Sequence, residues 1–182
     1  MAVNRQGDIG WFSPDPRAII PLDDAFHVPH GLARTIKKGK FEITIDQDFE
    51  EVIFACSKAH GDTWISSEII QNYCWLHYDG YAHSVETRLD GKLVGGLYGV
   101  ALGGAFFGES MFHWATDASK VALVQLVNHL RQQGFQLLDT QWVTPHLEQF
   151  GTQLISKAEY LQRLREALAL ERQWAPPEIR LG

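Results

Sequence analysis

Basic residues are too few in this chain for a general nucleic-acid-binding protein. Sixteen lysines and arginines stand against 22 aspartates and glutamates, a net charge of −6, whereas such proteins carry a basic surplus. Long apolar runs are lacking too: no stretch approaches the roughly 18 residues of a membrane span, and the N-terminus has no apolar signal segment. We therefore expect a cytoplasmic protein without a membrane partner.

Cysteine is also scarce. The two cysteines, Cys56 and Cys74, lack the spacing of metal ligands, so the sequence argues against a disulfide framework and a zinc site. Because free cysteine is among the most buried residue types, we expect both side chains to lie in the core.

The rest of the composition is that of an ordinary globular protein. With 182 residues, 45% of them hydrophobic and 21% charged, the chain is long enough to bury a real core. We expect one domain, or one domain with a small appendage.

The most informative stretch runs from residue 83 to 110. Asp90-Gly91 is a hairpin signal between apolar runs, and it predicts two or three antiparallel strands. Glycine recurs from Gly95 to Gly108, and glycine weakens a strand unless another backbone or a ligand must approach closely. Glu109, which follows, is either a solvated turn residue or a carboxylate at the mouth of an apolar pocket that holds a cation.

The most basic stretch of the chain precedes this region. It has no acidic residue between residues 25 and 41, and its basic residues are Arg34, Lys37, Lys38 and Lys40. Two interpretations stay open, a solvated loop and a contact for phosphates, which lysine and arginine position without reading base sequence.

A further short apolar run, residues 135–141, predicts a strand. Side chains alternate along an extended chain, so Leu137, Asp139 and Gln141 are expected on one face. A carboxylate and an amide together at a strand end suit proton handling. The alternative is a hydrogen-bonded strand terminus with no chemical role.

The remaining periodicities predict helices and strands in the order β-α-α-β-β-β-α-β-α-β-α from residue 41 onwards. Asp46 and Asp117 are expected helix caps, and residues 18–20 a short edge strand. This order predicts an α+β or mixed α/β sheet covered by helices.

With these residues in view, the chain resembles the bacterial leucyl/phenylalanyl-tRNA-protein transferases. The resemblance lies in several segments that occur in the family's order. They are WFSPDPRAII from Trp11, TWIS from Thr63, LHYDGYAHSVE from Leu76, LVGGLYGVALG from Leu93, FGESMF from Phe107, ASKVALVQL from Ala118, LLDTQ from Leu137 and HLEQFG from His146.

The resemblance implies a GNAT-like acyltransferase domain over residues 43–175, preceded by a reduced N-terminal segment at 1–42, the remnant of a small domain, and followed by a tail at 176–182. It implies transfer of Leu, Phe or, less well, Met from aminoacyl-tRNA to the N-terminal Arg or Lys of proteins, which creates an N-degron. It also implies a monomer that needs neither metal nor coenzyme.

The resemblance further implies roles for particular residues. Two match the family's catalytic Asp-x-Gln, one lies near the reacting amine, three line the aminoacyl pocket, and two are aromatics near that pocket and the tRNA 3′ adenosine. In that order they are Asp139 and Gln141; Glu109; Leu97, Phe106 and Leu138; Tyr73 and Trp64. We hypothesise that Gln141 accepts a hydrogen bond from the attacking amine while Asp139 orients Gln141 and helps the proton leave.

Two rival functions remain. An acyl-coenzyme A-dependent GNAT enzyme would need a glycine-patterned pyrophosphate loop before a helix, and residues 109–120 lack that pattern. The other is a non-catalytic shortened paralogue that binds degron-bearing proteins or charged tRNA. Where the family has Cys before Gly-Glu-Ser, this chain has Phe107, which argues against thiol chemistry.

Overall fold

The computed structural model describes residues 2–3, 9–10, 12–59 and 64–175. Its strands are β1 (Ala2–Val3), β2 (Ile9–Gly10), β3 (Arg17–Ile20), β4 (Glu42–Ile45), β5 (Ala82–Leu89), β6 (Lys92–Leu102), β7 (Ala105–His113), β8 (Leu137–Gln141) and β9 (Gln153–Ile155). Its helices are α1 (His30–Lys37), α2 (Phe49–Ala59), α3 (Ser67–Tyr78), α4 (Ala118–Gln132), α5 (Pro145–Glu148) and α6 (Lys157–Leu168).

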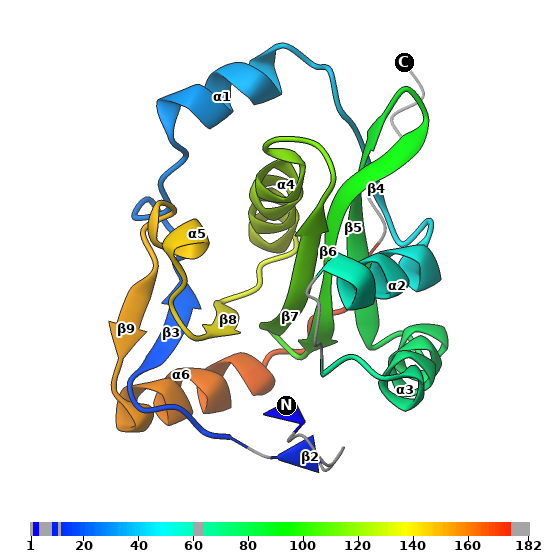
Figure 1. The fold of residues 1–182 in the computed structure, drawn as a ribbon. Helices are drawn as coiled ribbons and strands as arrows, with labels where there is room; N and C mark the ends of the chain where they lie inside the picture. Colours follow the sequence, from blue (N-terminus) through cyan, green and yellow to red (C-terminus); the bar gives the residue numbers. More distant parts are fainter. Residues whose placement is uncertain (1, 4–8, 11, 60–63, 176–182) are drawn as a thin grey trace.

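A seven-stranded sheet in the order β4-β5-β6-β7-β8-β3-β9 organises the molecule (Figure 1). Its strands pair antiparallel except β7 with β8, which are parallel. The expected mixed α/β sheet and the expected element order are confirmed. β3 is not an edge strand, because it pairs with β8 on one side and with β9 on the other. It lies in the main sheet, while a domain boundary near residue 42 stays a prediction.

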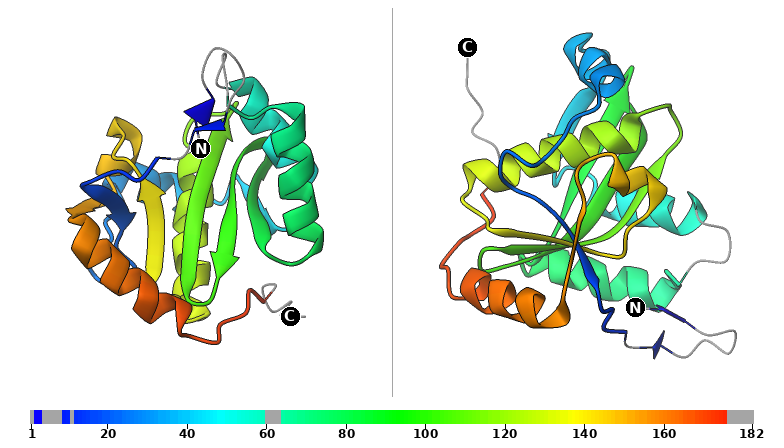
Figure 2. Two further views of the ribbon diagram at one scale, coloured as in Figure 1. Left: turned by 90° about the horizontal axis from the view of Figure 1, so that it is seen from below. Right: turned by 90° about the vertical axis from the view of Figure 1, so that its left-hand side faces the viewer.

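Helices cover both faces of this sheet (Figure 2). On one face, α4 packs its apolar stripe against side chains such as Leu97 and Leu138. On the other face, α2 and α3 enclose Tyr98 and Phe112, and α6 covers the β3–β8 side. Neighbouring residues of one strand therefore face different layers, as Leu97 and Tyr98 show.

Turns lie where the sequence predicts them. Asp90 and Gly91 have φ of 51° and 74°, the left-handed pair that a two-residue hairpin turn requires. The glycine pattern has a structural cause at Gly99, where a Cβ would collide with the Phe107 carbonyl and the Phe106 ring. There it is another part of the chain that approaches, rather than a ligand.

Of the two expected aspartate caps, Asp46 is wrong, whereas Asp117 occupies the cap position of α4 without making a capping hydrogen bond. α2 begins at Phe49, and the Asp46 carboxylate instead accepts the backbone N–H of Ser84 at 2.8 Å. Asp117 does precede α4, but its backbone is left-handed (φ 68°) and its carboxylate makes no capping hydrogen bond; it pairs with Lys120 at 3.2 Å. Periodicity of the flanking helix could not reveal the longer-range partner of Asp46.

Three further features bear on the expectations. Cys56 is buried, which raises the pKa of its thiol to about 12, and Cys74 is half-buried. The basic stretch contains a helix, α1, that the sequence did not predict. In the described part of the chain, no helix has the length and apolar character needed to cross a bilayer.

Candidate functional site

The candidate site lies where β7 and β8 separate. The two strands pair only from Ala105↔Leu137 to Phe107↔Asp139. Beyond these pairs a register shift between Tyr98 and Gly99 bends the neighbouring β6–β7 ladder, as bulges commonly do. The side chain of Gln141 spans the resulting gap, with Nε2 donating to the Gly108 carbonyl at 3.3 Å.

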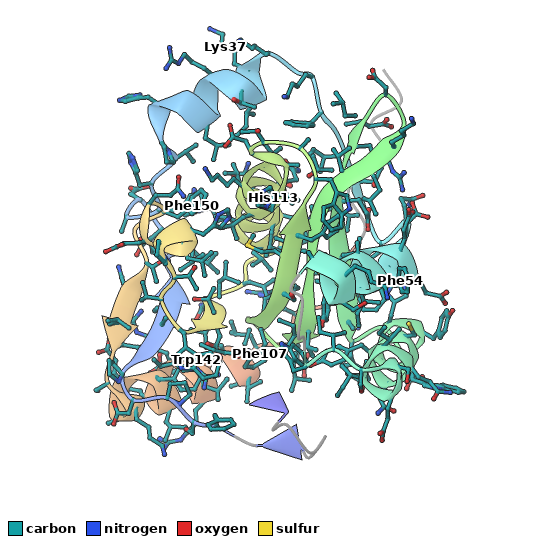
Figure 3. The ribbon with its side chains drawn as sticks, in the orientation of Figure 1. Lys37, Phe54, Phe107, His113, Trp142 and Phe150 are labelled. Carbon is teal, nitrogen blue, oxygen red and sulfur yellow. The ribbon has the colours of Figure 1, made fainter. Side chains whose placement is uncertain are left out.

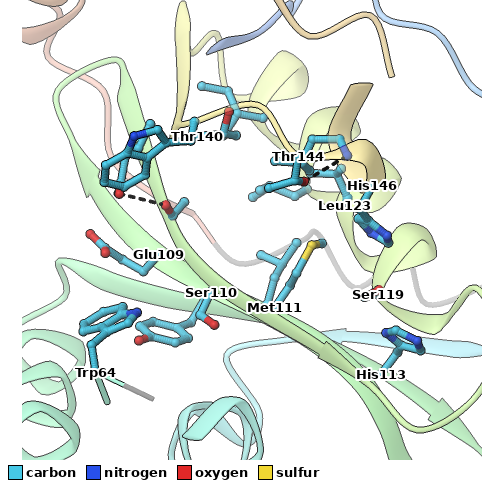
Figure 4. A pocket seen from close by; sticks show the side chains of 18 residues that line it. Trp64, Glu109, Ser110, Met111, His113, Ser119, Leu123, Thr140, Thr144 and His146 are labelled. Atoms are coloured by element: carbon cyan, nitrogen blue, oxygen red, sulfur yellow. Dashed lines mark hydrogen bonds between the residues drawn. The ribbon is translucent and has the colours of Figure 1, made fainter. Parts of the chain in front are cut away.

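A pocket of about 530 Å³ opens in this gap, within the size range of ligand sites. Figure 4 shows Glu109 and Trp64 at one end and His113, Ser119 and His146 at the other. Aliphatic side chains line the middle: Leu97, Met111, Leu123, Leu126, Leu138 and Leu147. The pocket is therefore apolar along its length and polar at both ends.

Glu109 is the carboxylate at the first end. Burial raises its pKa, while hydrogen bonds from Tyr73 and Gln141 act in the opposite direction by favouring the charged form. The phenol of Tyr73 is buried, and burial together with Glu109 raises its pKa. Of the two interpretations left open by the sequence, the structure fits a partly buried carboxylate in an apolar pocket rather than a solvated turn residue.

Asp139 lies on the other side of the strand. Its carboxylate is fully buried, and no part of it lines the pocket among the described residues. Arg17 donates to both oxygens, at 3.0 and 2.6 Å, and the Tyr160 hydroxyl donates at 2.7 Å. The backbone N–H of Gln141 adds a fourth donor at 2.9 Å. This arrangement suits an Asp139 that orients Gln141, which is one part of the role that the resemblance implies. It does not suit the other part, help with proton removal, because a proton acceptor would have to reach the pocket.

Gln141 breaks the expected alternation. Its φ of 68° is left-handed, so its side chain leaves the face that it would share with Asp139 and joins the pocket wall with Leu138 and Thr140. The expectation that Asp139 and Gln141 share a face is thus wrong, because alternation holds only while the backbone stays extended. The two residues are coupled through the backbone instead.

The structure places the other expected pocket residues at different distances from the pocket. Leu97, Leu138 and Trp64 line the pocket. Tyr73 contacts it indirectly, through Glu109. Phe106 is fully buried and stacks on Trp174 with ring centroids 5.4 Å apart, and it is not among the described lining residues.

The basic residues lie apart from the pocket. Arg34 and Lys37 are on α1, and Lys38 and Lys40 follow it; all four side chains are exposed. Figure 3 shows Lys37 at the edge of the molecule, with the pocket residue His113 between it and Trp142 in this view. Within the described ranges, none of the four forms an ion pair with a carboxylate.

Sequence reasoning missed several residues of the site. Leu123 and Leu126 were visible as an apolar helical stripe, which also describes an ordinary core. Arg17 stood in a motif but without a role, and Tyr160 lay in an amphipathic helix. His146 lines the pocket with a buried Nε2 that has no hydrogen-bond partner among the described residues; it stood in the HLEQFG segment, but without a role.

One group of side chains has the arrangement of metal ligands. The ligand atoms of Asp46, His77 and His83 all lie within 4.8 Å of one another. The Asp46 carboxylate, however, already accepts from the indole N–H of Trp174 at 2.8 Å and lies 2.9 Å from Nδ1 of His83. Since none of the three lines the pocket, this group has no part in the candidate site.

Comparison with known proteins decides the family. The model of the family "Leucyl/phenylalanyl-tRNA protein transferase" matches residues 19–165. This chain belongs to that family. It is 57% identical over 166 residues to the leucyl/phenylalanyl-tRNA–protein transferase of Herpetosiphon aurantiacus, covering 91% of this chain and 86% of that protein. It is 54% identical over 170 residues to that of Akkermansia muciniphila, covering 92% and 88%.

Solved structures bear on the fold alone. A GCN5-related glucosamine N-acetyltransferase region of a fungal multi-domain β-N-acetylglucosaminidase superposes with a TM-score of 0.55 at 15% identity, over 78% of this chain and 20% of that one. The expected GNAT-like sheet is therefore confirmed. The curated relatives are similar to this chain in sequence, and the acetyltransferase region is similar to it in fold alone.

Proposed function

We propose that this chain transfers leucine or phenylalanine, and less well methionine, from aminoacyl-tRNA to the N-terminal Arg or Lys of a protein. The observation that carries the proposal is the placement of Glu109 and Gln141 across the gap between β7 and β8, at one end of an apolar pocket. Membership of the family supports the donor and the reaction class.

The apolar middle of the pocket suits the side chain of the donor. Leu97, Leu126 and Leu138 are almost fully buried there, and Leu123 and Met111 complete the wall. Such a wall discriminates by only about 1 to 3 kcal/mol per methylene. It therefore accepts leucine, phenylalanine and methionine while favouring the side chains that fill it best.

The reaction is aminolysis of an ester. The neutral α-amine of the acceptor attacks the carbonyl carbon, a C–N bond forms, the C–O bond to the terminal ribose breaks, and the proton lost by the amine ends on the ribose oxygen. Nε2 of Gln141 donates to the Gly108 carbonyl and to Glu109, which leaves Oε1 to accept a hydrogen bond from the amine. Holding ester and amine together supplies much of the rate.

Glu109 is placed to receive the acceptor. An N-terminal Arg or Lys brings a cationic side chain and an α-ammonium group that must lose a proton before it attacks, and a partly buried carboxylate attracts such charges more strongly than an exposed one does. Trp64 lies at the same end of the pocket, and an aromatic face adds cation–π attraction. We propose that this end binds the N-terminal residue of the acceptor protein.

The exposed basic residues Arg34, Lys37, Lys38 and Lys40 form the tRNA contact in this proposal. They are free of carboxylate partners in the described part of the chain, so their charges are available to phosphates. The N-terminus made by the reaction would be an N-degron, and the place of the reaction the cytoplasm.

The start of α4 argues against the alternative function, an acyltransferase that uses acyl-coenzyme A. A pyrophosphate would need free N–H groups and positive potential there. Asp117 occupies the cap position of α4, and its carboxylate is held by Lys120 at 3.2 Å. The ion pair of Asp117 with Lys120 leaves little net positive charge there to attract a diphosphate.

The test is transfer of labelled Leu or Phe from charged tRNA to peptides that differ only in an N-terminal Arg, Lys or Ala. Label on the Arg and Lys peptides alone is the expected result, and Gln141→Ala should lower it by about 10²-fold. Absence of label on every peptide, from folded protein, would overturn the proposal in favour of a binding-only paralogue.

A further inference from the structure

Two residues outside the pocket hold the Asp139 carboxylate, and they come from opposite ends of the chain. Arg17 on β3 donates Nε to Oδ1 at 3.0 Å and Nη2 to Oδ2 at 2.6 Å. Tyr160 on α6 donates its hydroxyl to Oδ2 at 2.7 Å. The Arg17 guanidinium also lies over the Tyr160 ring, 4.8 Å from its centroid, so the two donors support each other.

Together with the backbone N–H of Gln141, these donors occupy the acceptor sites of the Asp139 carboxylate. Asp139 Oδ1 accepts from Arg17 and from the backbone N–H of Gln141 at 2.9 Å, while Oδ2 accepts from Arg17 and Tyr160. A carboxylate offers about four acceptor sites. Each donor therefore fixes where the other three point, and the carboxylate of this buried residue cannot turn without leaving one of them unpaired.

The hydrogen bond between the backbone N–H of Gln141 and Asp139 connects this buried cluster to the pocket, because the Gln141 side chain lies in the pocket wall. A non-glycine residue with φ of 68° persists only where its surroundings hold it. Asp139 holds the N–H of Gln141, and the Gly108 carbonyl holds its Nε2 at 3.3 Å. Loss of the first contact would let the backbone relax towards the extended form, which would carry the side chain away from the pocket wall.

We infer that Tyr160 and Arg17 are positioning residues for aminoacyl transfer, acting through Asp139 on the left-handed backbone of Gln141. The inference rests on the proposed function. Neither side chain lines the pocket. Substituting either one should therefore lower the rate of the chemical step and leave the binding of both substrates nearly unchanged.

The test is Tyr160→Phe, which removes only the hydroxyl, with the exposed Tyr81→Phe as the matched control. We expect kcat to fall about 10- to 100-fold, the scale on which a misplaced reacting group slows a reaction. KM for aminoacyl-tRNA and for the peptide should each change less than about threefold. A wild-type rate, or a raised KM with unchanged kcat, would overturn the inference.

A double-mutant cycle separates action through Asp139 from general stabilisation. In an Asp139→Asn background, Tyr160→Phe should cost less than about threefold in kcat, because the residue through which it acts is already altered. An equal cost in both backgrounds would overturn the inference.

Arg17→Lys serves as the second variant and decides the question if Tyr160→Phe fails to fold. It keeps the charge but loses the two-point contact, so the same selective loss in kcat is expected, and an unchanged kcat counts against the inference. If the wild-type chain labels neither Arg nor Lys peptides, the proposed function fails, and this inference with it. An active wild type with an unimpaired Tyr160→Phe overturns the inference alone.

Discussion

The Asp139 carboxylate accepts the backbone N–H of Gln141 at 2.9 Å, although the two side chains lie on different sides of β8. The acid is buried with Arg17 and Tyr160, and the amide stands in the pocket wall. The pair in the family motif thus consists of a buried carboxylate and a pocket-lining amide, joined by one main-chain hydrogen bond.

Asp139→Asn should destabilise the chain. The substitution leaves the largely buried guanidinium of Arg17 without its anionic partner, and breaking a buried pair costs about 3 to 5 kcal/mol. Urea denaturation measures the free energy of unfolding, with the exposed Asp24→Asn as control. Equal losses in the two variants would show that the buried ion pair contributes little.

The stability of the wild type relative to Glu109→Gln should depend on pH. Because burial raises the pKa of Glu109, the folded chain keeps this proton to a higher pH than the unfolded chain does. Its stabilisation is complete below the unfolded value of about 4.3 and is lost as the pH rises through the folded pKa. The variant should therefore gain stability relative to wild type as the pH rises across that window. Denaturation curves at pH 4 to 7 measure this difference in stability, with the exposed Glu148→Gln as control. A difference between wild type and Glu109→Gln that does not change with pH would contradict the prediction.

Neutralising the basic stretch should weaken tRNA use and spare peptide use. In the triple variant Arg34→Ser, Lys37→Ser, Lys38→Ser, we expect KM for aminoacyl-tRNA to rise and its salt dependence to flatten by roughly 0.7 to 0.9 per lost phosphate contact. The exposed triple Lys58→Ser, Lys92→Ser, Lys157→Ser removes the same charge elsewhere. Identical salt slopes in the two triples would place the tRNA on another surface.

Narrowing the pocket should change donor choice. Leu147 is half-buried on α5 and lines the pocket, so Leu147→Phe adds volume where the donor side chain lies. The ratio of kcat/KM for Leu over Phe donors should rise at least about tenfold. The exposed Leu154→Phe should leave that ratio unchanged. A ratio unaffected by Leu147→Phe would mean that the donor binds away from α5.

Gly99→Ala should be destabilising and Gly31→Ala should not. A Cβ at Gly99 meets the Phe107 carbonyl and the Phe106 ring, whereas at Gly31, inside α1, nothing lies within 4 Å. We expect a loss of about 1 to 3 kcal/mol at Gly99 and a gain of about 0.5 to 1 kcal/mol at Gly31. Thermal unfolding of both variants checks the pair, and a stable Gly99→Ala would show that the strands can move apart.

Local patterns predicted the framework of this fold. The Asp90-Gly91 turn, the apolar stripe of α4 and the order of elements depend on neighbours along the chain, which the sequence displays. The same reasoning singled out Glu109, because a carboxylate after an apolar glycine-rich strand is an unusual arrangement, but it left open whether this residue was a solvated turn residue or a pocket carboxylate.

What could not be predicted depends on distant contacts. The left-handed Gln141 requires the buried Asp139, and that in turn requires Arg17, 122 residues earlier. The failed helix cap at Asp46 has the same cause, since Asp46 binds Ser84 across the β4–β5 pair. In each case a tertiary hydrogen bond outweighed a local preference.

The position of β3 between β8 and β9 has a consequence for biosynthesis. Ala18 pairs with Gln141 on one side and with Leu154 on the other, so this strand waits for partners that lie more than a hundred residues later in the chain. Contacts of such long sequence separation form slowly. The half of the sheet that carries Asp139 and Gln141 is therefore completed only after β9 has been synthesised, and the pocket wall beside it forms late in folding.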